Sequence, residues 1–386
     1  MDKLILGESL EVLIDHRGRT PKKLGGDFTQ AGVPVISAQI VSGGYVDTSS
    51  ARNISEEMWQ KWMPIKTTKN DVILTSEAPL GRCALIPDKA PYALGQRVFG
   101  LRGKKGILDS RFLYFALQSP FMQDQLISRS SGTTVFGIRQ AELVKVQVPD
   151  PGFMQQQAIA AVLGSLDDKI AVNDHIIAKL SELSTAAFLS SHPKHMVSIP
   201  DVSHVTMGQS PPGDTYNETA EGLPFYQGTK DFGFRFPGKR VWCTAAARRA
   251  SAKDVLVSVR APVGTINVAT EECGIGRGLA AVRSTTHPHT LLQALSADKS
   301  IWLPYEKEGT VFGSINKKQF SKLEIPWPED SSLDEIEERL QSLDDLLAQY
   351  TAESRMLAEL RDTLLPQLMS GKLRVKDAEK IVEDNV

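Results

Sequence analysis

Residues 154–192, MQQQAIAAVLGSLDDKIAVNDHIIAKLSELSTAAFLSSH, contain the pattern that decides the fold. Apolar residues recur there at alternating steps of four and three, which is the spacing that places one side chain per turn on a single helical stripe. Adding 177 to each position of the stripe reaches a second stripe, and each stripe holds seven apolar residues in nine. The first stripe consists of Ile159, Leu163, Leu166, Ile170, Asn173, Ile177, Leu180, Ser184 and Ala187, and the second of Ile336, Leu340, Leu343, Leu347, Tyr350, Ser354, Leu357, Arg361 and Leu364. The sequence therefore predicts two long helices of one design.

A single stripe of this kind is typical of an ordinary amphipathic helix that packs on a core, and this interpretation stays open for each helix taken alone. Two matched copies of about five heptads favour a coiled-coil seam instead. Each helix has the other as its nearest candidate partner, because the roughly 140 residues between them leave room for the chain to return antiparallel.

The segments on either side of the first helix repeat as well. Short β-branched or alternating runs, separated by Gly, Pro and Asn turns, predict β-rich structure before the first helix and again after it, with one helix over about 110–128. The framework of the first segment returns in the second: NDVILTSEAPLG at 70–81 becomes KDVLVSVRAPVG at 253–264, and GTTVFGI at 132–138 becomes GTVFGSI at 309–315.

The expected fold class is α+β, with two β-rich domains joined by two long antiparallel helices that form an intramolecular coiled coil. The order of domain, helix, domain, helix makes this a pseudo-two-fold internal repeat. The expected boundaries are 1–150 for the first β-rich domain, 151–192 for the first helix, 193–330 for the second β-rich domain, 331–375 for the second helix and 376–386 for a C-terminal tail.

The two copies differ between their framework blocks. In the sequence comparison SAQIV at 37–41 faces QGTKD at 227–231, and LGQRV at 94–98 faces GIGRG at 274–278. Two copies of one scaffold with different targets would show this pattern. Ordinary drift after duplication explains any single block equally well.

Charge is distributed unevenly along the 386 residues, although the net charge is only -2. The first β-rich segment carries 19 Lys and Arg against 15 Asp and Glu, and residues 331–386 carry 7 against 13. A mildly basic domain is weak support for nucleic-acid binding, because a strong electrostatic footprint is far more basic. The chain shows neither a signal-peptide pattern nor a long apolar window, so we expect a cytoplasmic protein without a membrane partner. Three cysteines without a C-x-x-C pair predict neither a disulfide framework nor a zinc site.

Motifs for catalysis are missing from the sequence. A base methyltransferase needs an N/D-P-P-Y/F loop, and Ser210-Pro211-Pro212-Gly213 lacks both the amide or acid and the aromatic residue. A phosphate-cradling motor loop needs G-x-x-x-x-G-K-S/T, which Gly371-Lys372-Leu373 does not supply. Histidines near residues 192 and 287 fit surface turns better than metal ligands. We therefore expect no catalytic residues, no metal site and no enzyme activity in this chain.

In its repeat and its motifs the chain resembles the specificity subunit of Type I restriction-modification enzymes. The likeness rests on the G-T-x-V-F-x-I pattern, on a strand ending in I/V-P-x-P before each long helix, and on the closing segment LAELRDTLLPQLMSGKLRV at 357–375. It covers nearly the whole chain. The helix entries depart from the family pattern, with MQQQ at 154–157 and EDSSL at 329–333.

The resemblance implies a non-catalytic DNA-recognition subunit with two target-recognition domains. Each domain would read one half of a split, asymmetric site in double-stranded DNA. The two helices would dock two modification subunits, which are methyltransferases that carry S-adenosylmethionine. Restriction subunits would supply translocation and cleavage with ATP and Mg, and this chain itself would hold no cofactor. The alternative is a non-catalytic scaffold whose β-rich domains bind protein or carbohydrate.

Recognition of DNA requires Lys and Arg for phosphates and polar side chains on loops for base edges. For each residue taken alone, a solvated loop is the competing interpretation. In the first domain the expected DNA-binding residues are Arg17, Arg19, Thr20, Lys22, Lys23, Gln39, Thr75, Ser76, Gln96, Arg97, Thr133 and Thr134. In the second they are Gln209, Ser210, Gln227, Lys230, Ser258, Arg260, Arg277, Thr310 and Lys317.

Overall fold

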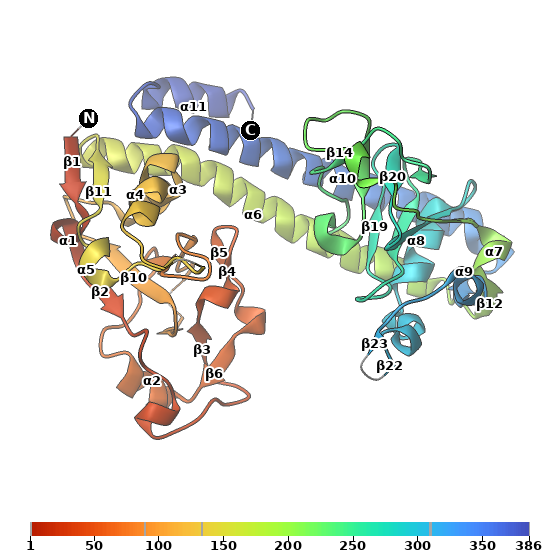
Figure 1. The fold of residues 1–386 in the computed structure, drawn as a ribbon, viewed down its shortest axis with the longest axis horizontal. Helices are drawn as coiled ribbons and strands as arrows, with labels where there is room; N and C mark the ends of the chain where they lie inside the picture. Colours follow the sequence, from red (N-terminus) through yellow and green to blue (C-terminus); the bar gives the residue numbers. More distant parts are fainter. Residues whose placement is uncertain (1, 89, 133, 309–310, 386) are drawn as a thin grey trace. The chain divides into compact units, whose positions relative to one another are not determined.

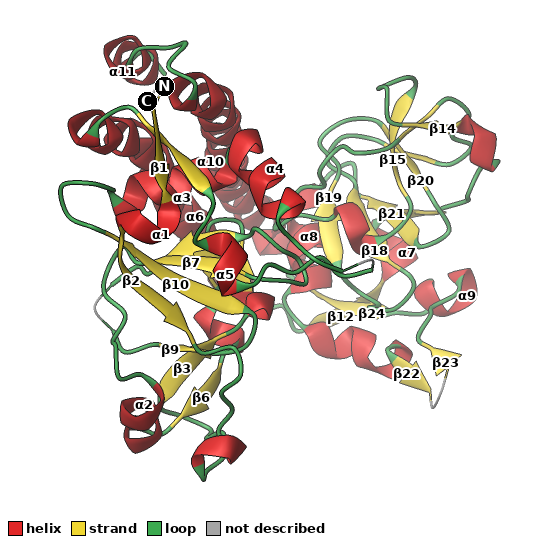
Figure 2. Cartoon of the chain, turned by 60° about the vertical axis from the view of Figure 1, so that its left-hand side comes forward, coloured by secondary structure: helices red, strands yellow, loops and turns green. Residues whose placement is uncertain are grey.

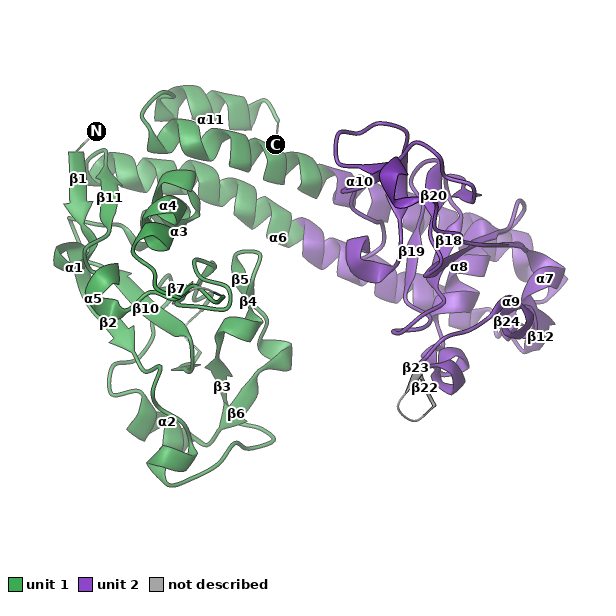
Figure 3. Cartoon of the chain, viewed as in Figure 1, with its two compact units in different colours: residues 1–172, 353–386 green, residues 173–352 purple. Residues whose placement is uncertain are grey.

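The computed structural model describes residues 2–88, 90–132, 134–308 and 311–385. It divides into two compact units, which Figure 3 colours separately and whose elements Figure 1 labels. Unit 1 comprises Met1–Val172 and Glu353–Val386, and unit 2 comprises Asn173–Ala352. Each unit therefore contains one β-rich segment and one part of each long helix. Within the described ranges, no helix is long and apolar enough to cross a membrane.

Unit 1 is built on a four-stranded antiparallel sheet of order β2-β10-β7-β8 (Figure 2). A second sheet of order β6-β3-β9 contains one parallel pair, β3 with β9. The strands are β1 Asp2–Ile5, β2 Leu10–Asp15, β3 Val33–Ile36, β4 Val41–Ser42, β5 Tyr45–Val46, β6 Arg52–Ile54, β7 Val72–Thr75, β8 Cys83–Leu85, β9 Ala93–Leu94, β10 Val98–Gly103 and β11 Gln147–Asp150. The helices outside the long pair are α1 Leu6–Ser9, α2 Glu56–Trp62, α3 Ser110–Gln118, α4 Pro120–Ser128, α5 Gln140–Leu143 and α11 Val375–Glu383.

Unit 2 repeats this plan. Its four-stranded antiparallel sheet has the order β13-β21-β18-β19, and its second sheet, of order β14-β16-β15-β20-β17, again contains one parallel pair, β15 with β20. The strands are β12 His195–Ser198, β13 His204–Met207, β14 Tyr216–Asn217, β15 Leu223–Tyr226, β16 Trp242–Cys243, β17 Arg249–Ala250, β18 Val255–Ser258, β19 Ile266–Val268, β20 Cys273–Ile275, β21 Leu279–Arg283, β22 Lys307–Glu308, β23 Val311–Phe312 and β24 Glu324–Trp327. The shorter helices are α7 Ile199–Val202, α8 Pro288–Ser296 and α9 Lys317–Phe320. The predicted internal repeat is confirmed at the level of sheet topology.

The two predicted stripes lie on the long helices α6 (Phe153–Ser190) and α10 (Asp330–Met369). All eighteen stripe positions are buried or half-buried, so the stripes face the interior as their spacing predicts. In unit 1, Leu163 of α6 and Leu364 of α10 belong to one hydrophobic core, which also contains residues of α3. In unit 2, Phe188 of α6 and Leu340 of α10 belong to another. Each domain thus shares its core with both long helices.

Ion pairs in unit 1 show that the helices run antiparallel there. Lys169 Nζ lies 3.2 Å from Glu353 Oε1, and Arg361 Nη1 donates to Asp167 Oδ1 over 2.7 Å. A later residue of one helix therefore pairs with an earlier residue of the other, which is the direction expected from the sequence.

One predicted helix boundary is wrong, and one predicted helix is divided in two. The second long helix ends at Met369 rather than at 375, because Gly371 adopts the left-handed conformation (φ 72°) that terminates helices, and the expected tail contains α11. The expected helix over 110–128 is two helices. Pro120 begins the second one at its first turn, where Ser119 caps it by accepting a hydrogen bond from the Met122 backbone N–H.

The carboxylate of Asp167 connects three elements of unit 1. It accepts a hydrogen bond from Arg361 of α10, and the Tyr114 hydroxyl of α3 donates to its other oxygen over 3.4 Å. Burial raises the pKa of Asp167, and the Arg361 hydrogen bond opposes this shift. The arginine thus compensates for placing a carboxylate against the hydrophobic core.

Removing that arginine is expected to destabilise unit 1. In Arg361→Met the carboxylate keeps its burial but loses its cation, and we expect a loss of about 2 kcal/mol in the free energy of unfolding, since the pair is partly exposed. Urea unfolding measures the effect. The control is Arg355→Met on the exposed face of α10, which should unfold like the wild type. Equal midpoints for both variants would show that the pair contributes nothing.

Candidate nucleic-acid interface

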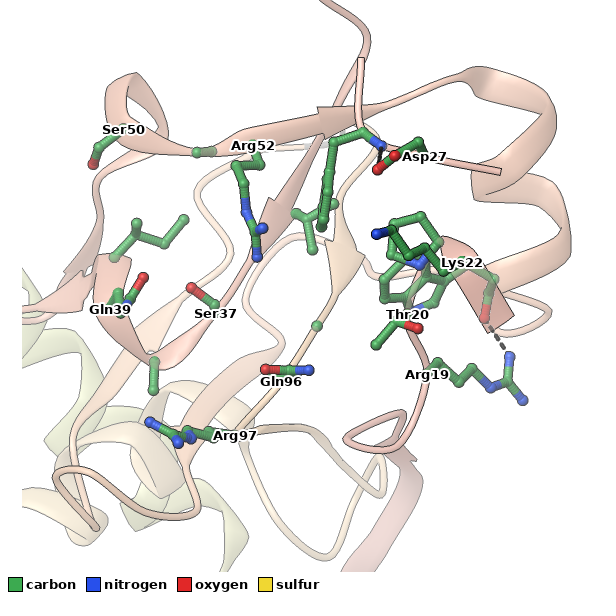
Figure 4. A pocket seen from close by; sticks show the side chains of 18 of the residues that line it. Arg19, Thr20, Lys22, Asp27, Ser37, Gln39, Ser50, Arg52, Gln96 and Arg97 are labelled. Carbon is green, nitrogen blue, oxygen red and sulfur yellow. Dashed lines mark hydrogen bonds between the residues drawn. The ribbon is translucent and has the colours of Figure 1, made fainter. Parts of the chain in front are cut away.

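Three loops of unit 1 lie side by side because the strands that precede them are neighbours in the fold. Strands β3 and β9 run parallel, with Ile36 opposite Leu94, so the residues that follow both strands emerge at the same edge. The Gly95 backbone N–H donates to the Ile36 carbonyl over 2.8 Å and holds the two loops together. The turn after β2, which contains Thr20, lies on the same side (Figure 4).

These loops surround a cavity of about 880 Å³. Six of the predicted DNA-binding residues line it, and they are Arg19, Thr20, Lys22, Gln39, Gln96 and Arg97. Among its charged lining residues, four are basic and one, Asp27, is acidic. The excess of cations favours an anionic ligand.

Arg52 and Ser37 are polar residues of this cavity that were not among the predicted set. The guanidinium of Arg52 lies over the ring of Phe28, 3.9 Å from the centroid, and its side chain points into the cavity (Figure 4). Ser37 faces it from the end of β3. No sequence signal distinguished Arg52, because a lone arginine on a short strand is usually solvated. Ser37 stood in a block that differs between the repeats, and this difference was the available signal.

Interactions with the fold orient two of the cavity's arginines. Arg19 Nη1 donates to the Trp62 carbonyl, and Arg97 forms an ion pair with Glu77, 3.0 Å between Nε and Oε1. Figure 4 shows both side chains at the edge of the cavity, with Gln96 nearer to its centre.

In unit 2 the corresponding loops bring together Ser210, Gln227 and Arg277. Gln227 Nε2 donates to the Ser210 hydroxyl oxygen over 2.6 Å, and Arg277 Nε donates to the same oxygen over 3.2 Å. Gly276 makes room for this cluster, because a Cβ at that position would lie 2.7 Å from Gln227 Cδ. Three predicted residues from three separate loops therefore meet at one point.

Backbone hydrogen bonds define which residues of the two copies are equivalent. The Gly95 N–H donates to Ile36 in unit 1, as the Gly276 N–H donates to Tyr226 in unit 2. The carbonyls of Arg97 and Gly278 likewise accept from the ends of β7 and β18. Gln96 therefore corresponds to Arg277. The sequence comparison, which placed Arg97 opposite Arg277, is wrong by one residue because it followed the arginine rather than the glycine.

Three predicted contacts are corrected because their side chains are buried. Thr75 is fully buried and its hydroxyl donates to the Pro79 carbonyl over 2.6 Å, and the equivalent Ser258 donates to the Pro262 carbonyl over 2.5 Å. Ser76 is only 2% exposed. These residues shape the turn after the central strand and cannot reach a base.

Arg17 also has a structural environment. Its Nε and Nη2 donate to the two oxygens of Asp15 over 2.8 and 2.7 Å, its Nη1 donates to the Ile138 carbonyl, and its guanidinium lies 4.1 Å from the centroid of the Phe99 ring. Each of its three side-chain nitrogens donates one hydrogen bond to the fold.

The remaining predicted residues stand on exposed loops or at a helix start, and the structure does not bring them into either cluster. They are Lys23, Thr134, Gln209, Lys230, Arg260 and Lys317. Thr133 and Thr310 lie outside the described residues. Across the part of the chain that the structure describes, no group of three or more His, Cys, Asp or Glu residues could hold a metal ion.

Residues 4–182 and 196–355 each match the family described as Type I restriction modification DNA specificity domain. The putative type I restriction enzyme MjaX specificity subunit of Methanocaldococcus jannaschii is 27% identical to this chain, and the alignment covers 96% of this chain and 93% of that protein. The Type I restriction enzyme EcoBI specificity subunit of Escherichia coli is 26% identical over an alignment that covers 35% of this chain and 28% of that protein. The crystal structure of the Type-I restriction-modification system S subunit from M. genitalium shares the fold, with a TM-score of 0.58, 19% identity and 95% coverage of both chains. The chain therefore belongs to the Type I restriction-modification DNA specificity family, and its role is that of a non-catalytic subunit for recognition of a DNA sequence.

Proposed function

We propose that this chain reads a bipartite, asymmetric target in double-stranded DNA, with one half read by each β-rich domain. The observation that carries the proposal is the loop cluster that both units form at equivalent positions. The scaffold is repeated, yet Ser37 and Gln96 of unit 1 are replaced by Gln227 and Arg277 in unit 2. Two copies of one site with different polar side chains suit two different half-sites.

The chemistry of the cavity in unit 1 supports duplex DNA as the ligand. Lys22 and Arg52 are suited to phosphate contacts, which set affinity, while Gln39 and Gln96 offer amides that can distinguish base edges. A protein or carbohydrate ligand does not call for this excess of cations, and the family membership does not support that alternative.

The helices are proposed to dock two modification subunits. Six large apolar side chains on α6 and α10 are exposed: Met154, Val172, Leu183, Leu189, Leu346 and Met356. These side chains are available for contact with a protein partner, and those that lie together in one patch would mark the docking surface. The modification subunits would carry S-adenosylmethionine, and restriction subunits, where present, would use ATP and Mg. The specificity chain would supply only the recognition of the DNA sequence.

Sensitivity of DNA binding to salt tests the proposal. Phosphate contacts release counterions, so the affinity of the chain with its modification subunits for target duplex is expected to fall at least tenfold between 50 and 200 mM salt. A variant with Lys22→Gln and Arg52→Gln should show a shallower dependence. Its control, with Lys105→Gln and Arg139→Gln at exposed positions outside the cavity, should retain the wild-type dependence. Binding that ignores both salt and sequence would reject DNA recognition. Methyl transfer by the isolated chain, at rates that follow its concentration, would contradict the non-catalytic role instead.

A further inference from the structure

The residue that follows Gly95 in unit 1 and Gly276 in unit 2 occupies the same place in both copies. It is Gln96 in the first and Arg277 in the second, and both side chains are exposed. The preceding glycine is tightly packed in each unit, because an added Cβ would lie 2.8 Å from Val35 Cγ1 at Gly95 and 2.7 Å from Gln227 Cδ at Gly276. The backbone at this position is therefore fixed while the side chain is free to vary.

Arg277 is oriented without being neutralised. Its Nε donates to Ser210, and among the described residues no carboxylate forms an ion pair with it. Several other arginines of unit 2 do pair with acids, as Arg283 does with Asp254 and Arg240 with Asp231. The bond to Ser210 leaves both Nη groups of Arg277 for a ligand. Two parallel donors are what the O6 and N7 atoms of guanine accept in the major groove.

Gln96 offers different chemistry at the same place. Its amide carries one acceptor and two donors, which match the N6 and N7 atoms of adenine. Figure 4 shows it inside the cavity, with Arg52 and Ser37 on one side and Thr20 on the other. The cations around it can hold the phosphate backbone while the amide reaches the base edge.

We infer that this position is a base-reading position in both domains, and that Arg277 reads a guanine in one half of the target while Gln96 reads an adenine in the other. The inference rests on the proposed function. Ser210 acts as a positioning residue in unit 2, because its hydroxyl holds Arg277 and Gln227 in one arrangement.

Selection from randomised duplexes by the chain in complex with its modification subunits tests this inference. The Arg277→Gln variant is expected to replace the G·C preference by A·T at one position, with a loss of about tenfold or more for the original duplex, since a bidentate base contact contributes roughly 1–3 kcal/mol of discrimination. The Gln96→Arg variant should make the reverse change in the opposite half. Ser210→Ala should weaken the G·C preference without changing its position.

Matched variants separate base reading from charge. Arg249→Gln removes an equal charge from the same unit at an exposed residue paired with Glu272, and it should leave the selected sequence unchanged. Arg277→Lys keeps the charge but loses the planar fork, so it should bind the original duplex more weakly and keep a reduced G·C preference. If Arg277→Gln weakens all duplexes equally and leaves the selected sequence unchanged, the residue contacts phosphate and the inference is overturned. A wild-type complex that selects no sequence would instead reject the proposed function. Thermal unfolding of each variant checks that the fold is retained.

Discussion

Replacing residues 1–150 by the first domain of another family member is expected to change one half of the recognised DNA sequence and to leave the other half unchanged. Each unit has its own hydrophobic core and its own loop cluster, so a domain can be exchanged without disturbing the cluster of the other unit. If about three base pairs lose their partners at roughly 1–3 kcal/mol each, affinity for the original target should fall by a factor of about a hundred or more. Sequencing the methylated bases in cells that also contain the modification subunit gives the result.

The exchange must respect the contacts between the first domain and α6. The Asp109 backbone N–H donates to Gln156 Oε1, and Gln156 is fully buried, so the incoming domain needs a helix start that this glutamine can contact. A junction at Pro151–Gly152 lies between β11 and α6 and interrupts neither element. The reciprocal exchange of residues 193–330 is the control and should change only the opposite half. A change of both halves in either chimera would contradict modular reading.

The helical stripes show how much of this fold could be predicted from sequence. Spacing alone placed Leu163 and Leu364 on buried faces, and the repeat of the framework blocks indicated two domains of one topology. The spacing of apolar residues along a helix can be read directly from the sequence, because it depends only on residues that are close together in the chain. The end of α10 could not be predicted in the same way, because whether Gly371 or a later residue ends the helix depends on local backbone conformation.

The loop residues show where sequence reasoning stops. Thr75 and Ser258 are of the residue types that contact bases, but in the folded chain their hydroxyls donate hydrogen bonds to proline carbonyls. Arg52 lines the cavity because strand β6 pairs with β3, and no sequence motif indicates this pairing. The equivalence of Gln96 with Arg277 required the hydrogen bonds of the two glycines, since the sequence comparison favoured a match of arginine with arginine.

Inserting four residues into both long helices is expected to lengthen the unread gap of the target by one or two base pairs. Helix α6 passes from unit 1 to unit 2 between Val172 and Asn173, and α10 passes back between Ala352 and Glu353, so both insertions belong at these points. Four helical residues add about 6 Å, which equals one to two steps of about 3.4 Å along DNA. The methylated sequence of cells that carry the variant measures the gap.

Rotation makes four residues a suitable length. At 3.6 residues per turn, four residues turn a helix by about 40° beyond a full revolution, and one base pair turns DNA by about 36°. The rotation therefore corresponds to about one base pair, which lies within the one or two base pairs expected from the translation. Insertion into α6 alone is the control. It lengthens only one of the two helices, so the Asp167–Arg361 pair of unit 1 and the core that α6 and α10 share in unit 2 cannot both keep their register, and we expect weaker binding instead of a moved half-site. If the double insertion binds DNA and methylates the original sequence with its original gap, the helices do not set the spacing between the half-sites.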